Sequence, residues 1–233
     1  MKTPKARSPK DLSHRSSLSD GGGRRLELPY LFAYDVAASR RARQVLRCLQ
    51  RWRIDGQLSV HETQLLPFQA RELAAELLEY VDRRADRLLL CRLSQRGGAP
   101  VYALSLSRPR PPMMGSRTPA PLPSRLQEGW YLLAYDVRDE RRLQRTQSRT
   151  AKVCTYLQRS VYLYHGEGTG LARLLEEVTE ELEHHVDDMR LYALSGPRDL
   201  WFLSGPVPPL ASIKDKRLGA NLWQRLLSWI GVH

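Results

Sequence analysis

The chain repeats itself at a fixed spacing of 101 residues. The tetrapeptide Ala-Tyr-Asp-Val occupies residues 33–36 and recurs at 134–137. Because one register is kept over about sixty residues without a gap, the sequence predicts two copies of one structural unit. The same shift relates Arg40-Arg41 to Arg141-Arg142, residues 57–60 to 158–161, and Asp86, Leu93 and Ser94 to Asp187, Leu194 and Ser195.

Each copy predicts the same succession of strands and helices. Apolar, aromatic and β-branched runs are typical of strands, and apolar residues at helical spacing between them indicate two amphipathic helices per copy. The expected strands are 30–36, 57–63, 88–93 and 101–106 in the first copy and 130–137, 158–165, 189–194 and 200–203 in the second; the apolar helix faces span 42–49 and 73–81, then 143–157 and 174–186.

This order is the ferredoxin-like βαββαβ pattern with an extra edge strand. Such a unit has an antiparallel sheet with both helices on one face, so the other face of the sheet is uncovered. Two units in one chain can bury these faces against each other. We therefore predict an α+β fold of two tandem ferredoxin-like domains, packed as an intramolecular pseudo-dimer, sheet against sheet with the helices outside.

The positive charge of the chain lies mainly outside the two units. The net charge is +12, from 37 Lys and Arg against 25 Asp and Glu. Three flanking segments carry +5, +4 and +3, so the two units together are neutral. The last segment includes a short amphipathic helix, which could pack on the body, lie on a membrane surface or fill a groove of a partner. The predicted division is a basic disordered tail (1–25), domain 1 (26–106), a Pro-rich linker (107–127), domain 2 (128–205) and a C-terminal tail (206–233).

Composition limits the compartment and the partner. Three cysteines without CxxC spacing predict a reduced, cytoplasmic protein without a zinc site. The basic N-terminal stretch lacks an apolar core, and no run approaches ~18 apolar residues, so we expect neither a secretory signal nor a membrane span. A strongly basic chain favours a polyanionic partner such as nucleic acid or an anionic membrane surface.

Asp35 and its copy Asp136 are the candidate catalytic and metal-binding residues. Each ends a predicted strand, and in a two-fold arrangement both carboxylates face the seam between the units. Two hard oxygen ligands can hold Mg²⁺ with water molecules, and such a metal can polarise a phosphodiester or activate a water. The alternative is that each aspartate caps the helix that follows.

Basic side chains follow one face of the first helix in each copy, whereas the second helices are acidic. No acidic residue interrupts either basic stripe. A basic face can track phosphates, and an acidic face repels them. The alternative is that these are solvated helix faces without a ligand. The predicted nucleic-acid-binding residues are Arg40, Arg43, Arg47 and Arg51 in the first copy and Arg141, Arg145, Arg149 and Lys152 in the second.

Two motifs of each copy resemble the CRISPR-associated protein 2 family of spacer-acquisition proteins. The first motif is an apolar strand ending in Tyr-Asp-Val before an Arg-rich helix, at 34–36 and 135–137. The second is the Gln-x-Ser-Val strand at 57–60 and 158–161. The copies depart from each other within the second motif, where His61 replaces the usual aromatic residue and Leu163 stands where the first copy has Glu62.

The resemblance implies a function in CRISPR adaptation. The family works as ferredoxin-like homodimers whose strand-end aspartates approach each other, so Asp35 and Asp136 would be the metal aspartates and this chain would supply both halves of the dimer. It also implies a subunit that binds prespacer duplex DNA, bridges CRISPR-associated integrase dimers and acts at the CRISPR array. The alternatives are a Mg²⁺-dependent endonuclease, because members are described as metal-dependent endoribonucleases or deoxyribonucleases, and a toxin-like ribonuclease of the same fold.

Overall fold

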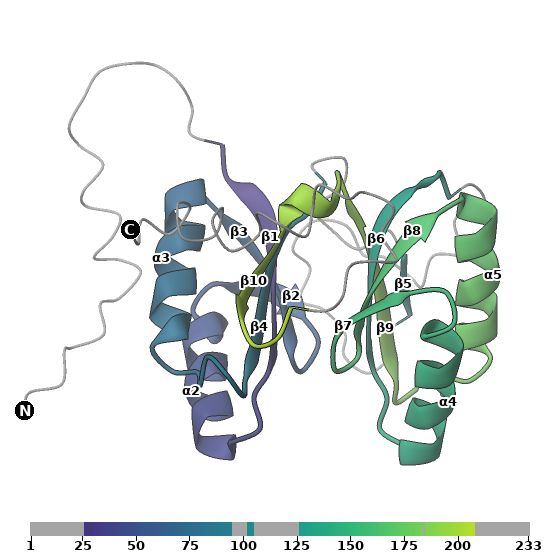
Figure 1. The fold of residues 1–233 in the computed structure, drawn as a ribbon, viewed down its shortest axis with the longest axis horizontal. Helices are drawn as coiled ribbons and strands as arrows, with labels where there is room; N and C mark the ends of the chain where they lie inside the picture. The colour runs from purple at the N-terminus through teal and green to yellow at the C-terminus, as the bar shows by residue number, and fades with distance from the viewer. Residues whose placement is uncertain (1–25, 95–101, 105–125, 184, 208–233) are drawn as a thin grey trace, which may run out of the picture.

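The computed structural model describes residues 26–94, 102–104, 126–183 and 185–207 (Figure 1). The predicted N-terminal tail, nearly all of the predicted linker, and residues 208–233 with the expected amphipathic helix lie outside the described residues. In the part of the chain that is described, no helix combines the length and the apolar character needed to span a membrane.

Both repeats have the predicted βαββαβ order. The first contains β1 (Leu28–Asp35), α2 (Ser39–Gln50), β2 (Arg53–Gly56), β3 (Val60–Leu65), α3 (Pro67–Leu78), β4 (Arg87–Arg92) and β5 (Tyr102–Leu104). The second contains β6 (Gly129–Asp136), α4 (Glu140–Thr150), β7 (Thr155–Gln158), β8 (Val161–Gly166), α5 (Gly168–Thr179), β9 (Asp188–Leu194), a 3-10 turn (Pro197–Asp199) and β10 (Leu200–Ser204).

The Gln-x-Ser-Val motif forms a hairpin, although the sequence predicted a continuous strand there. In the first repeat β2 ends at Gly56 and β3 begins at Val60, so Gln57 and Ser59 lie in the connection. Each repeat has a residue with a positive φ angle at this connection: φ is +137° at Gly56 in the first repeat and +60° at Ser160 in the second. A Cβ on Gly56 would come 2.0 Å from the carbonyl oxygen of Val60. The apolar run therefore contains a tight reversal that strand periodicity alone does not reveal.

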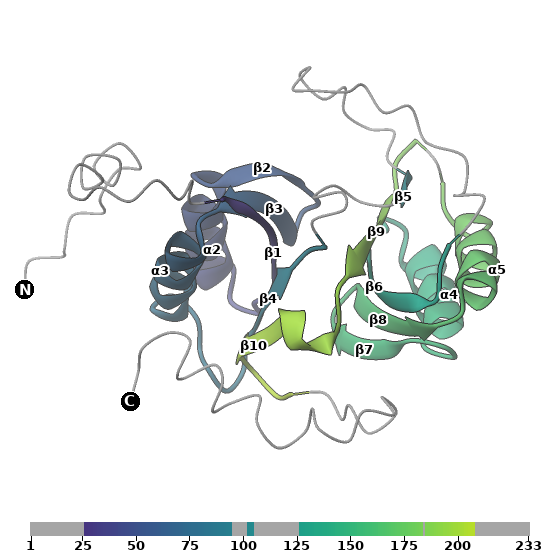
Figure 2. The same cartoon turned by 90° about the horizontal axis from the view of Figure 1, so that it is seen from above.

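Each five-stranded antiparallel sheet takes its edge strand from the other repeat. The strand orders are β10-β4-β1-β3-β2 and β5-β9-β6-β8-β7. The sequence predicted each last strand as an edge of its own copy, and this assignment was wrong (Figure 2). The segment before β10 crosses to the first repeat, where Arg92 of β4 binds Asp199, which is 3% exposed, with 2.9 Å from Nε to Oδ1. The exchange covers the open edges of β4 and β9.

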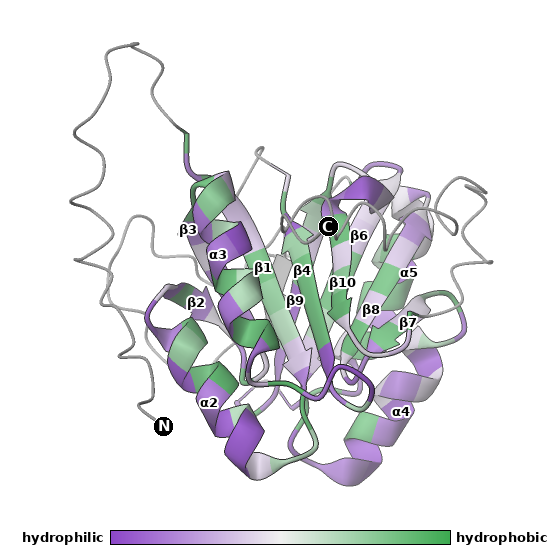
Figure 3. Ribbon diagram, turned by 60° about the vertical axis from the view of Figure 1, so that its left-hand side comes forward, coloured by the Kyte–Doolittle hydropathy of each residue, from purple (hydrophilic) through white to green (hydrophobic). Residues whose placement is uncertain are grey.

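The two sheets pack face to face, and the helices lie outside, as predicted (Figure 1). Strand alternation divides each sheet between two layers. In β1, Leu31 and Ala33 enter the core between the sheets, whereas Phe32 packs toward α2 and α3. Leu132 and Ala134 of β6 lie in the same central core as Leu31. Figure 3 shows the apolar strands enclosed between helices that carry many hydrophilic residues. The body thus has three apolar layers.

Candidate functional site

Asp35 and Asp136 lie at one edge of the body, where β1 and β6 lead into α2 and α4 (Figure 1). They share strand faces with Ala33 and Ala134, so both are on the seam side of their sheets, and both are half-buried. The capping alternative does not hold, because the N-cap of α2 is Ala38 and that of α4 is Asp139, whose carboxylate accepts a hydrogen bond from the backbone of Arg142.

The two aspartates have opposite neighbours. Asp35 lies across from Arg87 in the β1–β4 pairing, and Asp136 lies across from Asp188 in the β6–β9 pairing. Burial raises the pKa of the Asp136 carboxyl, and the nearby negative charge of Asp188 raises it further. The repeat spacing aligns Arg87 with Asp188, so the two copies differ here: a cation lies beside Asp35 and an anion beside Asp136.

A buried ionic cluster joins the repeats next to Asp136. The Arg190 guanidinium, with 8% of its side chain exposed, lies 2.9 Å from Oδ2 of Asp55 and 2.7 Å from Oε1 of Glu62. It also contacts Asp188 at 3.3 Å. The Tyr192 hydroxyl donates to Glu62 at 2.9 Å. We call these five residues the seam cluster; it fixes acids of the first repeat against a cation of the second.

The seam cluster has no counterpart at the equivalent positions. Leu89, Cys91 and Leu163 stand where the cluster has Arg190, Tyr192 and Glu62. There Arg87 lies 5.2 Å above the ring of Tyr156 and donates to the carbonyl oxygen of Leu157. The residues that the two copies share do not reveal this cluster. The signal was in their differences, a Glu aligned with Leu and an Arg aligned with Leu.

The basic residues divide into paired and unpaired groups. Arg51 forms an ion pair with Glu76, and Arg145 and Arg149 both contact Glu181. The predicted separation of basic and acidic surfaces is therefore incomplete, because carboxylates of the second-helix regions reach these arginines. The remaining candidates are exposed and form no ion pair with the described residues: Arg40, Arg43, Arg47, Arg141 and Lys152.

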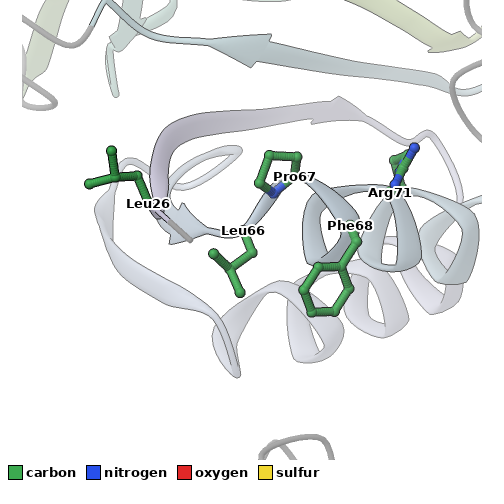
Figure 4. Close-up of a pocket in the computed structure, with 5 residues that line it drawn as sticks. All are labelled: Leu26, Leu66, Pro67, Phe68 and Arg71. Atoms are coloured by element: carbon green, nitrogen blue, oxygen red, sulfur yellow. The ribbon is translucent and has the colours of Figure 1, made fainter. Parts of the chain in front are cut away.

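A pocket lies at the opposite end of β1 from Asp35 (Figure 4). Leu26, Leu66, Pro67, Phe68 and Arg71 line it. Its lining is mostly apolar and contains no acid or nucleophile, so it does not fit phosphodiester chemistry.

His61 is fully buried on the helix side of β3. Its ring stacks on Tyr34 with 5.8 Å between ring centroids, and both ring nitrogens lack a geometrically good hydrogen bond among the described residues. Burial, reinforced by the charge of Arg53, lowers the pKa of His61 to about 4. In the second repeat Tyr162 takes this position and stacks on Tyr135.

The buried neutral imidazole makes the stability of the fold depend on pH. The unfolded chain binds a proton near pH 6.5 and the folded chain only near pH 4, so this contribution is present above pH 6.5 and is lost as the pH falls through that window. The loss is on the order of 3 kcal/mol. Urea unfolding at pH 7.5 and pH 4.5 will measure it, and His61→Phe should reduce the difference. An unchanged pH dependence in His61→Phe would assign the effect to other groups.

These features define a class of protein: two ferredoxin-like repeats packed face to face, with strand-end aspartates at the seam and arginine-bearing helices outside. The family described as CRISPR associated protein Cas2 matches residues 29–98 and 129–199, one segment in each repeat. The chain belongs to this family and contains its domain twice in tandem.

Curated relatives agree with this assignment. Over 59 aligned residues, the chain is 46% identical to the "CRISPR-associated endoribonuclease Cas2" of Allochromatium vinosum. The aligned segment covers 25% of this chain and 63% of the relative. Over 67 aligned residues, it is 40% identical to "CRISPR-associated endoribonuclease Cas2 2" of Nitrosomonas europaea. This aligned segment covers 29% of this chain and 59% of the relative. The matches therefore span less than two thirds of either relative.

Proposed function

We propose that this chain is the non-integrase subunit of a CRISPR adaptation complex, which binds prespacer duplex DNA and bridges integrase dimers at the CRISPR array. The observation that carries the proposal is that one chain builds the complete two-sheet body of a family whose domain it contains twice. Exposed arginines on an outer helix add a surface suited to phosphates.

A Mg²⁺-dependent endonuclease is the second candidate, and the carboxylates beside the seam favour it. Mg²⁺ in proteins commonly takes one or two carboxylates and several water molecules. Asp136 and Asp188 supply two adjacent carboxylates for such an ion, although Arg190 already contacts both oxygens of Asp188, and the positive charge of Arg87 opposes an ion beside Asp35. No group of three or more metal-ligating side chains occurs among the described residues. A bound Mg²⁺ would polarise a phosphodiester. The names of both relatives include an endoribonuclease activity.

Incubation with duplex DNA and single-stranded RNA, in Mg²⁺ and in EDTA, separates these functions. We expect the wild-type chain to bind the duplex and leave it intact in both buffers, because positioning needs only phosphate contacts. Gel shift and strand integrity are measured on the same samples. The Asp35→Ala/Asp136→Ala variant should bind equally. Its matched control is Glu72→Gln/Glu79→Gln, which makes the same charge change at exposed positions of the first repeat away from the seam.

Each other outcome supports a different function. Cleavage that requires Mg²⁺, is lost in the aspartate variant and persists in the control would establish the endonuclease. Loss of cleavage on Asp188→Asn would then assign the metal to the Asp136–Asp188 pair. Tighter binding of single-stranded RNA than of duplex DNA would favour the toxin-like ribonuclease.

A further inference from the structure

The equivalent helices α2 and α4 present their charges differently. Helix α2 contains four arginines and no acidic residue, and α4 contains four arginines and one glutamate. The repeat spacing aligns Arg43 with Gln144 and Arg47 with Ser148. The two basic stripes are therefore not copies of each other, although the helices are.

The arginines of α4 are turned toward the neighbouring helix. Arg145 and Arg149 stand one position beyond Gln144 and Ser148, which rotates them by about 100° around the helix axis. Helix α4 packs on α5, and both arginines reach the carboxylate of Glu181 just after it. Glu177 also lies 4.0 Å from Arg149. These two cations and two anions form a locally neutral surface.

The N-terminal ends of the two helices also differ in charge: that of α4 is acidic, and that of α2 is not. Helix α4 is preceded by Asp139, which caps it, and begins with Glu140. A carboxylate at this end accepts hydrogen bonds from free backbone N–H groups, and its negative charge interacts favourably with the helix dipole. Helix α2 has Ala38 and Ser39 at the equivalent positions and no side-chain cap. Arginines follow directly, so an anion at this end of α2 meets no competing carboxylate from the helix itself.

Three exposed cations remain on α2. Arg40, Arg43 and Arg47 follow one face at spacings of three and four residues, and none forms an ion pair with a described residue. Arg41 and Arg51 are engaged by Asp86 and Glu76. From the first to the last of the three, the helix rises about 10 Å, close to three steps along one DNA strand.

We propose that the duplex-binding surface is one-sided: it consists of Arg40, Arg43 and Arg47 on α2, and the α4 surface does not contact the phosphates. This inference rests on the proposed function. The partner is the phosphate backbone of duplex DNA, because the surface consists of three exposed positive charges in a row and these three residues offer no aromatic ring on which bases could stack.

Two variants with the same change in net charge test the proposal. Arg43→Gln/Arg47→Ser copies the second repeat onto α2 at exposed positions, and Arg145→Gln/Arg149→Gln removes two charges from α4. Fluorescence anisotropy with a labelled duplex, over a series of salt concentrations, measures affinity and its salt dependence. The α2 variant should bind roughly tenfold more weakly and lose about two from the slope of log K against log salt, while the α4 variant stays near wild type.

A second control protects against misfolding, because the α4 variant leaves Glu181 without its arginines. Arg141→Gln/Lys152→Gln removes two exposed cations of the second repeat that form no ion pair with the part of the chain that the structure describes, and it too should bind like wild type. If either variant of the second repeat weakens binding as much as the α2 variant, the surface is two-sided and the inference is wrong. If wild type binds no duplex at all, the proposed function itself fails, which is a different result.

Discussion

Replacing Arg190 with leucine will destabilise the fold by about 3–5 kcal/mol, the cost of removing one partner from a buried ionic group. The guanidinium is the only cation in the seam cluster, and it contacts carboxylates on both repeats. Without it, the buried Glu62 keeps the Tyr192 hydroxyl but loses its compensating charge. Urea unfolding at neutral pH will measure the effect.

The equivalent positions of the other repeat suggest a second variant that restores part of the stability. Glu62→Leu/Arg190→Leu copies Leu163 and Leu89 from the equivalent positions of the other repeat. Because the double variant also removes the buried charge of Glu62, it should regain part of the lost stability, although Tyr192 loses its acceptor and Asp55 and Asp188 lose Arg190. Arg87→Leu, which removes the cation beside Asp35, should cost only about 1 kcal/mol. A double variant as unstable as Arg190→Leu alone would contradict this role of the cluster.

Cutting the chain between the repeats will leave both fragments in one folded body. A protease site placed among residues 105–125 separates a fragment that carries β5 from one that carries β10. Each fragment then supplies an edge strand to the sheet of the other, and both line the central core. Reciprocal strands and a shared apolar layer provide the kind of interface found in obligate dimers. The fragments should therefore separate only after denaturation.

The fold class could be predicted from the sequence because each strand and helix pattern occurs twice, once in each repeat. The constant 101-residue spacing and the two periodicities predicted the βαββαβ order and the packing of the uncovered sheet faces. It did not predict the strand exchange, because the run at 200–203 specifies a strand without specifying the sheet that accepts it. That choice depends on contacts such as Arg92 with Asp199, which join residues 107 positions apart.

The candidate site was predicted in part. The strand-end positions of Asp35 and Asp136 followed from strand alternation. The different surroundings of the two did not, because the partners Arg87 and Asp188 lie on other strands. The ion pairs of Arg145 and Arg149 were not predicted either. They depend on a shift of one position along the helix, which turns both side chains toward α5, and on Glu181, which lies beyond the end of α5.

The native mass of the chain, intact and after cutting, tests the central claim that one chain supplies both halves of a dimer. Light scattering across a range of concentrations should give 26.8 kDa for the intact chain, and the cut chain should keep the mass of its uncut form. An intact mass of twice this value that falls by half after cutting would show that the halves pair between chains, and two fragments that elute separately under native conditions would show that they do not pair.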